Sequence, residues 1–326
     1  MTSESSSPAS EDRAAPRALP RPQSRLAKLL DSDLFYSFKR SRLVVVAATL
    51  TLLMVGAALL APLIAPHNPY DLKSLVLLDA DTPPVWDAKG DRRFLLGTDD
   101  QGRDILSTIL YGTRSSLLVS VLAVGLALLL GVSAGLVAGY FGGWADTIIM
   151  RLADVQLTFP AILTALMVDG VAQVIFKGHK SGGGGAFWIL VVAIGLAFWV
   201  QYARTVRSVT LVERNKEYVQ AARLIGIGKI KIMFQHVLPN VLSPVLVIAT
   251  INLALAIITE ATLSFLGVGL PPTEPSLGTM IQIGNKYLFS GSWWMVAFPG
   301  ITLALLVLSV NLLGDWLRDA LNPKLR

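Results

Sequence analysis

The side chains of this chain that are capable of chemistry are few and far apart. Its three histidines, His67, His179 and His236, form no pair at metal-ligand spacing, so we expect no zinc or iron site. The chain has no cysteine, which excludes disulfides, thiolate metal sites and cysteine nucleophiles. Paired carboxylates and a nucleophile with a neighbouring base are also missing. The sequence therefore predicts no catalytic residue, no metal and no enzyme activity in this chain.

One segment, 178–185, has the sequence GHKSGGGG and the glycine content of a phosphate-binding loop. That motif needs Gly, Lys and Ser or Thr in direct succession, so that backbone amides and the lysine surround the phosphates together. Here His179 precedes Lys180. We therefore predict a flexible connection between two helices and no nucleotide site.

Composition places the chain in a membrane. Hydrophobic residues make up 53% of its 326 positions and charged residues only 15%, whereas soluble domains average about 25% charged residues. A bilayer core needs about 20 apolar residues in a helix, and backbone polar groups in lipid must be satisfied within the helix. The predicted fold is therefore all-α, an integral membrane protein with six transmembrane helices. They are 43–65, 116–140, 146–168, 187–206, 241–266 and 293–314.

The rest of the chain is organised around these spans. Residues 1–33 are rich in Ser, Pro, Ala and Arg and are predicted to be a disordered tail, and 34–42 leads into the first span. We expect 66–115 to lie outside the membrane, 116–320 to form the membrane core, and 321–326 to be a short tail. Of the 28 basic residues, 18 fall on one side of this arrangement and nine on the other. The positive-inside rule then makes both termini cytoplasmic.

The net charge of +6 does not indicate a nucleic-acid-binding surface, because the Lys and Arg residues lie between spans and not along one helix face. Two features within the spans concern packing. Gly131, Gly135 and Gly139 recur on one helix face and would let another helix backbone approach closely. Pro160 is expected to kink the third span, because it lacks a backbone donor.

The most distinctive segment lies in the predicted cytoplasmic loop 212–240 and has the sequence EYVQAARLIGIGKIKIMFQHVLP, starting at Glu217. Glu217 favours the positive end of a helix. Ala221 and Ala222 are strong helix formers with small side chains, so this face is suited to fit into a groove on another protein. Gly226 is suited to the left-handed conformation that ends a helix.

A second short helix is expected after this glycine, with an apolar stripe. Pro239 is expected to stop that helix, and Asn240 to cap the next span. From the residues alone, an amphipathic loop on the lipid surface stays equally possible. The stripe comprises Ile230, Ile232, Met233 and Val237.

The same segment resembles the EAA loop of ATP-binding-cassette (ABC) importers. The family pattern is Glu-Ala-Ala, three residues, Gly, nine residues, then Ile-x-Leu-Pro. The alanine pair and Gly226 match it, and Leu238 and Pro239 end it at the correct spacing. Glu217 stands four residues before Ala221, and His236 takes the isoleucine place. Both departures are similar to the variant found in dipeptide and oligopeptide permeases.

The resemblance extends over nearly everything from about residue 35 to 320 and is to the C-type subunit of that subfamily. It implies the type I ABC importer permease fold, with a cytoplasmic EAA coupling loop. The further segments that carry it are Phe38–Arg42, Ala65–Asp71, Leu96–Asp104, Tyr111–Leu117, Phe159–Pro160 and Leu263–Gly269.

By this resemblance the chain forms half of a pore that works by alternating access in the cytoplasmic (inner) membrane of a bacterium. Its partners would be membrane lipid, a second homologous permease, two ATPase subunits that bind ATP and Mg, and an extracytoplasmic solute-binding protein. The chain itself would hold no cofactor. Di- and oligopeptides are the implied substrates, while nickel, glutathione, opine and oligosaccharide importers share the architecture. The implied ATPase-coupling residues are Glu217, Ala221, Ala222, Gly226, Leu238 and Pro239.

Four charged residues are candidates for the transport pathway or a gate. Glu260 lies within a predicted span, where an ionised group costs roughly 2.5–3.5 kcal/mol and usually faces protein or water. Either it lines the pathway or it makes a hydrogen-bonded helix contact. Asp99, Arg103 and Asp104 either hold a loop in place or contact the binding protein. A secondary transporter would need ion-site residues on broken helices, and it would have no use for a docking loop.

Overall fold

The computed structural model describes residues 38–71, 76–176 and 184–321. The predictions for the tail 1–33 and for the loop 178–185 therefore fall wholly or mostly outside the described residues, as does nearly all of 321–326. The chain divides after Arg40 into two units. Only Phe38–Arg40 of the first unit are described, and they form a helical turn. The account below concerns the second unit.

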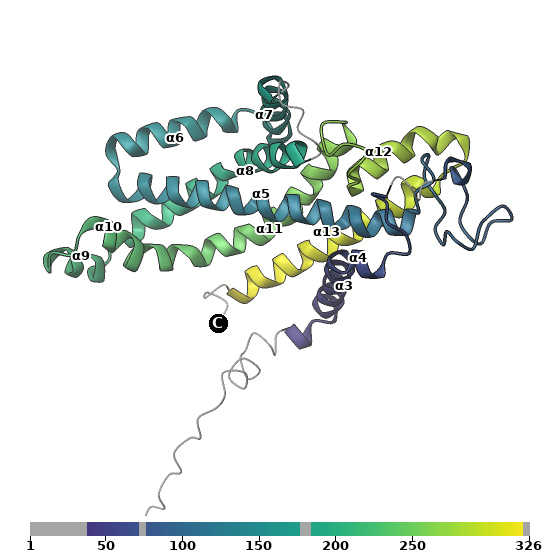
Figure 1. The fold of residues 1–326 in the computed structure, drawn as a ribbon. Helices are drawn as coiled ribbons and strands as arrows, with labels where there is room; N and C mark the ends of the chain where they lie inside the picture. Colours follow the sequence, from purple (N-terminus) through teal and green to yellow (C-terminus); the bar gives the residue numbers. More distant parts are fainter. Residues whose placement is uncertain (1–37, 72–75, 177–183, 322–326) are drawn as a thin grey trace, which may run out of the picture. The chain divides into compact units, whose positions relative to one another are not determined.

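The described part of this unit is built from helices, with its longest non-helical segment between α4 and α5 (Figure 1). Helix α5 packs along α8, and α11 lies between α5 and α13. The bounds are α3 Arg42–Leu59, α4 Ala61–Ile64, η1 Leu77–Asp79, α5 Ile105–Phe141, α6 Gly143–Leu157, α7 Ala161–Phe176, α8 Gly184–Glu213, α9 Glu217–Leu224, α10 Lys229–Ile232, η2 Met233–Val237, α11 Leu238–Phe265, α12 Leu277–Tyr287, η3 Leu288–Ser290 and α13 Trp294–Leu321.

Five helical stretches in the described residues are long and apolar enough to cross a membrane. A sixth is present if the bent pair α6 and α7 is taken as one span. The prediction of an all-α membrane fold is confirmed, and so are five of its six spans. The five stretches are Arg42–Leu59, Ile105–Phe141, Gly185–Glu213, Lys229–Phe265 and Trp294–Ala320.

The third predicted span is wrong as a single helix. Helix α6 ends at Leu157 and α7 begins at Ala161, and the two axes meet at 99°. Pro160 lies in the break, where its missing backbone donor and its ring prevent the helix from continuing. At the position of the expected kink, the chain therefore turns through nearly a right angle between two separate helices.

Helix α5, which contains the second predicted span, begins at Ile105, before the predicted start of the span at residue 116. Asp104 is the N-cap residue of α5, and its Oδ2 accepts a hydrogen bond of 2.9 Å from the backbone N–H of Ser107. At 1.5 Å per residue the 37 residues of α5 span about 55 Å, well beyond a hydrocarbon core of about 30 Å. Hydropathy alone therefore missed the part of the helix that extends past the lipid.

The glycine strip on α5 is the contact surface for α8, as predicted. A Cβ atom added at Gly139 would lie 2.7 Å from the Cβ of Thr210, and one at Gly135 would lie 2.7 Å from the Cβ of Val206. The same holds at Gly131, which faces Tyr202. Only hydrogen fits at these positions, because the two helix backbones are in close contact.

Replacing Gly135 by alanine is therefore expected to destabilise the α5–α8 pair by about 1–3 kcal/mol, the usual cost of overpacking a tight contact. Gly125 is the matched control on the same helix, because a Cβ there meets no atom within 4 Å. The thermal stability of the two variants in detergent checks this, and equal stability would contradict the packing role.

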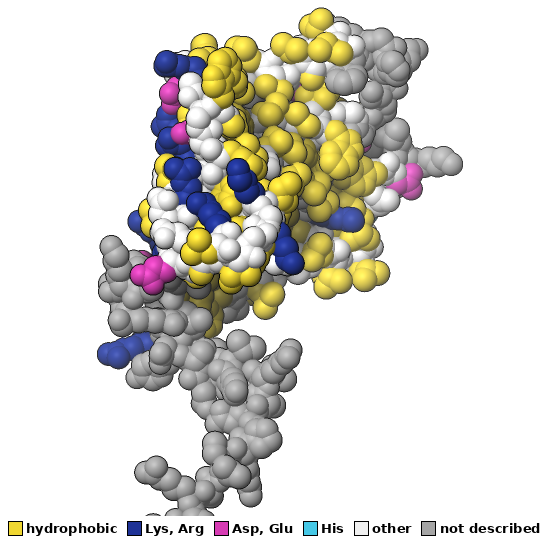
Figure 2. Space-filling view, turned by 90° about the vertical axis from the view of Figure 1, so that its left-hand side faces the viewer, with side chains coloured by type: hydrophobic (Ala, Val, Ile, Leu, Met, Phe, Trp, Pro, Cys, Tyr) yellow, Lys and Arg dark blue, Asp and Glu magenta, His cyan; other side chains and the backbone are white. Residues whose placement is uncertain are grey.

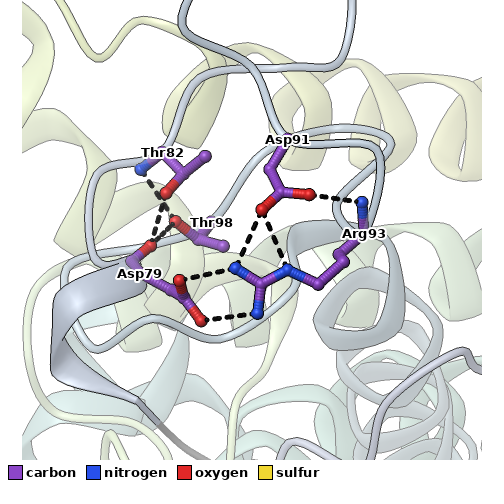
Figure 3. A network of polar contacts seen from close by, with 5 residues as sticks. All are labelled: Asp79, Thr82, Asp91, Arg93 and Thr98. Atoms are coloured by element: carbon purple, nitrogen blue, oxygen red, sulfur yellow. Dashed lines mark hydrogen bonds and ion pairs between the residues drawn. The ribbon is translucent and has the colours of Figure 1, made fainter.

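At the end of the bundle opposite α9 and α10, residues 76–104 form a folded loop (Figures 1 and 3). The guanidinium of Arg93 bonds both carboxylate oxygens of Asp79, at 2.8 and 3.1 Å, and the carboxylate of Asp91 at 2.9 Å. The backbone oxygen of Asp79 accepts hydrogen bonds from the hydroxyls of Thr82 and Thr98. These contacts fix the conformation of a loop for which the hydropathy pattern predicts no structure.

Candidate functional site

The loop between α8 and α11 forms one end of the bundle (Figure 1) and has the predicted helix, glycine turn and second helix. Gly226 has φ +85°, the left-handed conformation expected of it. Its N–H donates to the carbonyl of Arg223 at 3.0 Å, and the N–H of Ile227 donates to that of Ala222 at 3.1 Å. This is the Schellman pattern, which satisfies the last carbonyls of α9.

The predicted stop at Pro239 is wrong. The chain stays helical from Lys229 to Phe265, through one π-helical turn in which the N–H of Leu238 donates to the carbonyl of Met233. Just before the proline, the backbone hydrogen bonds join residues five apart and not four apart. We attribute the tolerance of Pro239 to this wider turn. Asn240 is consequently no helix cap and lies inside the first turn of α11.

The inner face of the loop is part of the core of the bundle. The side chains of Val219 and Ala222 are buried and pack in the same cluster as residues of α5 and α8. Ala222 is 5% exposed, so it supports α9 from inside, and the prediction that it enters a groove on another protein is wrong. The predicted stripe on the second helix is confirmed for Ile232, Met233 and Val237, which are buried, and not for Ile230.

The outer face of the loop carries exposed apolar side chains among charged ones. Leu224, Ile225 and Ile230 are 89%, 78% and 65% exposed, and Glu217 and Ala221 are exposed beside them. Because the inner face is occupied by the bundle itself, contact of this loop with another protein would use the outer face, where exposed apolar side chains are candidates for an interface. Figure 2 shows basic side chains gathered around this end. The exposed basic residues of the loop are Lys216, Arg223, Lys229 and Lys231.

Asp99 and Arg103 form a buried pair at the opposite end. The Nε of Arg103 donates to Oδ2 of Asp99 at 2.6 Å, its backbone N–H donates to Oδ1 at 2.8 Å, and its Nη1 donates to the carbonyl of Pro272 at 2.7 Å. The arginine is 3% exposed. The adjoining cavity measures about 10 Å³, about one water molecule. These contacts favour the loop-holding interpretation of this pair.

Asp104 has a similar local role. Besides capping α5, its Oδ2 accepts from the hydroxyl of Ser107 at 2.5 Å and lies 3.8 Å from Nδ1 of His67. The backbone N–H of His67 in turn donates to the Ser107 hydroxyl at 3.0 Å. The aspartate thereby connects the segment after the first span to the start of the second.

Glu260 is completely buried in α11. Its Oε1 accepts a hydrogen bond of 2.7 Å from the hydroxyl of Ser264. The nearby hydroxyl of Ser116, on α5, accepts from the backbone N–H of Leu277 at the start of α12, at 3.3 Å. The carboxyl group thus lies in a polar cluster where three helices meet, which favours the helix-contact interpretation over the pathway one.

Glu260→Gln is accordingly expected to keep uptake within about twofold of the unmodified chain, because glutamine retains the acceptor for Ser264 and the same shape. Glu260→Leu is expected to lower the yield of folded protein, since it leaves buried hydroxyls unpaired at about 1–3 kcal/mol. Uptake assays and detergent-stable yield measure both effects. A large loss of uptake in well-folded Glu260→Gln would restore the pathway interpretation.

The comparisons with known proteins agree with this architecture. The family described as binding-protein-dependent transport system inner membrane component matches residues 131–326. The N-terminal transmembrane domain of oligopeptide transport permease C matches residues 32–84.

Two curated relatives show the extent of the match. The dipeptide transport system permease protein DppC of Escherichia coli (strain K12) is 42% identical over 294 residues, which cover 90% of this chain and 93% of that protein. The di/tripeptide transport system permease protein DppC of Pseudomonas aeruginosa (strain UCBPP-PA14) is 41% identical over 275 residues, covering 84% and 86%.

A solved structure shows the same fold. A chain of the inward-facing MetNI methionine ABC transporter, in its native crystal form, superposes with a TM-score of 0.51 at 21% identity, covering 67% of this chain and 98% of that chain. At this identity the likeness concerns the fold alone.

A bundle of membrane-spanning helices with a helix-turn-helix loop at one end is the fold of an ABC importer permease subunit. The chain belongs to the family of binding-protein-dependent transport system inner membrane components, as a C-type permease of the dipeptide and oligopeptide branch. The resemblance seen in the sequence is thereby confirmed.

Proposed function

We propose that this permease subunit forms half of the pore of an ATP-driven importer of di- and oligopeptides, and that an ATPase subunit binds the outer face of its loop. The exposed apolar surface of Leu224, Ile225 and Ile230 carries the docking proposal, because the inner side of the same loop is fixed in the bundle. The names of the relatives, dipeptide and di/tripeptide permeases, support the substrate class.

The roles of the predicted coupling residues follow from their places in the loop. Glu217 and Ala221 lie on the exposed face, Gly226 forms the turn between the two helices, and Leu238 and Pro239 begin the membrane helix that leaves the loop. An ATPase that moves the loop would therefore displace α11 directly.

The remaining partners follow from the family. A second, related permease completes the pore, two ATPase subunits hold ATP and Mg, and an extracytoplasmic binding protein delivers the solute. Transport proceeds by alternating access. The basic side chains around the loop (Figure 2) support a cytoplasmic position for this end, with both termini inside and the chain in the bacterial inner membrane. Asp99, Arg103, Asp104 and Glu260 support the structure and do not line the pathway.

Uptake of labelled di- and oligopeptides by cells with and without this gene tests the proposal. The loop variant Glu217→Ala with Gly226→Pro is the control, because proline requires φ near −65° and the turn at Gly226 has φ +85°. Uptake lost in both the deletion and the variant supports an ATP-coupled peptide importer. Undiminished peptide uptake in the deletion would overturn the substrate class and direct the search to nickel, glutathione, opines or oligosaccharides.

A further inference from the structure

The hydroxyl of Tyr218 lies where the helices on both sides of the loop end. It donates to Oε2 of Glu213 at 2.5 Å and accepts from Nδ2 of Asn240 at 3.1 Å. Glu213 is the last residue of α8, and Asn240 lies in the first turn of α11. One side chain of α9 therefore connects the two membrane helices that enter and leave the loop.

Each partner of this hydroxyl is itself held in place. Oε1 of Glu213 pairs with Nζ of Lys216 at 2.6 Å, so both carboxylate oxygens are engaged. Nδ2 of Asn240 also donates to the carbonyl of His236 at 2.8 Å. That carbonyl lies in the π-helical turn, a departure from regular helix that is frequent at functional sites.

The tyrosine keeps its proton under all physiological conditions. Burial of the hydroxyl and its hydrogen bond to Glu213 raise the pKa of Tyr218 to about 12. The group is therefore protonated at neutral pH and donates to Glu213 in this structure. A hydrogen bond to a carboxylate is stronger than one between neutral groups. This contact is therefore suited to keep α9 attached to the end of α8 when α9 moves.

We propose that Tyr218 is a positioning residue that joins the docking loop to α8 and α11, so that a displacement of α9 moves both membrane helices together. This rests on the proposed binding of an ATPase to the loop. Val219 and Ala222 hold α9 by apolar contacts, which are non-directional. The guanidinium of Arg223 lies over the ring of Tyr140 on α5, 5.6 Å from its centre, and the side chain of Gln220 donates to the carbonyl of Asn215, just before α9. The Tyr218 hydroxyl differs from these contacts because it bonds a residue of α8 and a residue of α11 at once.

The joint is testable in the permease without any ATPase. The chain has no cysteine, so cysteines placed at the exposed positions Val212 and Leu242 carry a unique pair of spin labels on α8 and α11. Tyr218→Phe is expected to broaden the measured distance distribution. Tyr70→Phe is the matched control, because Tyr70 is 41% exposed and Tyr218 39%. An unchanged distribution in Tyr218→Phe would overturn the joint.

Coupling is measured on the whole transporter in liposomes, with its partner permease, ATPases and binding protein and a radiolabelled dipeptide. Tyr218→Phe and Glu213→Ala are expected to bind the ATPase as before and to lower dipeptide imported per ATP hydrolysed by at least about tenfold, the ratio for one lost charge-assisted hydrogen bond. Glu213→Gln retains an acceptor without its charge, so its import ratio is expected to lie between those of the unmodified chain and Glu213→Ala.

An unchanged import ratio in Tyr218→Phe would refute the role in coupling. Failure of the proposed function is distinguishable, because the unmodified chain would then bind no ATPase or import no dipeptide. In that case the spin-label distances still decide whether the joint exists.

Discussion

Leu224→Asp combined with Ile225→Asp is expected to abolish ATP-driven uptake while leaving the permease folded in the membrane. Burying a leucine or isoleucine at an interface contributes about 1.5–3 kcal/mol, so losing two weakens ATPase binding by a factor of roughly 10²–10⁴. Both side chains are mostly exposed in the free chain, at 89% and 78%. Their replacement therefore removes little contact within the fold. Co-purification of the ATPase and uptake of labelled dipeptide measure the two effects.

Leu78→Asp is the matched control for this variant. Leu78 is 94% exposed and belongs to the loop at the opposite end of the bundle (Figure 1), so it undergoes the same chemical change away from the docking surface. We expect it to bind the ATPase normally. Retention of the ATPase by the double aspartate variant would show that the outer face of α9 is not the docking surface.

Hydropathy was sufficient to identify five of the six predicted spans as single helices, and insufficient to locate where the helices begin and end. A run of apolar residues identifies α11, because lipid demands about 20 such residues. It does not identify the first turns of α5, since residues 105–115 include polar side chains and their helical state depends on the cap at Asp104. The break at Pro160 was visible as a proline, yet the 99° angle depends on tertiary contacts. One is the bond from Nε1 of Trp199 to Oε1 of Gln156, at 2.7 Å.

The position of the candidate site could be predicted from its motif, but which of its side chains are exposed could not. Spacing alone identified the turn at Gly226, because only glycine adopts φ +85° without strain. Spacing does not say which of two adjacent alanines faces outward, since that depends on how α9 lies on the core. The role of Tyr218 was missed for the same reason. Its partners Glu213 and Asn240 are 5 and 22 residues away and meet only because α8 and α11 end side by side.

Arg103→Ala is expected to destabilise the permease by about 3–5 kcal/mol, the cost of removing one partner from a buried ion pair. The substitution leaves the carboxylate of Asp99 without its charged partner and frees the carbonyl of Pro272. Asp99→Asn should cost less, because the asparagine oxygen still accepts from the backbone N–H groups of Gln101 and Arg103. Thermal unfolding in detergent, together with the yield of monodisperse protein, measures which of the two variants is less stable.

Arg92→Ala separates the effect of the pair from the loss of a positive charge, because Arg92 is exposed in the same loop and should change stability by less than about 1 kcal/mol. Peptide uptake by the Asp99→Asn variant then tests the second interpretation of this cluster. If the pair only holds the loop, uptake should fall in proportion to the amount of folded protein. A severe loss of uptake at normal folded yield would mean that Asp99 acts in transport, and the structural interpretation would be wrong.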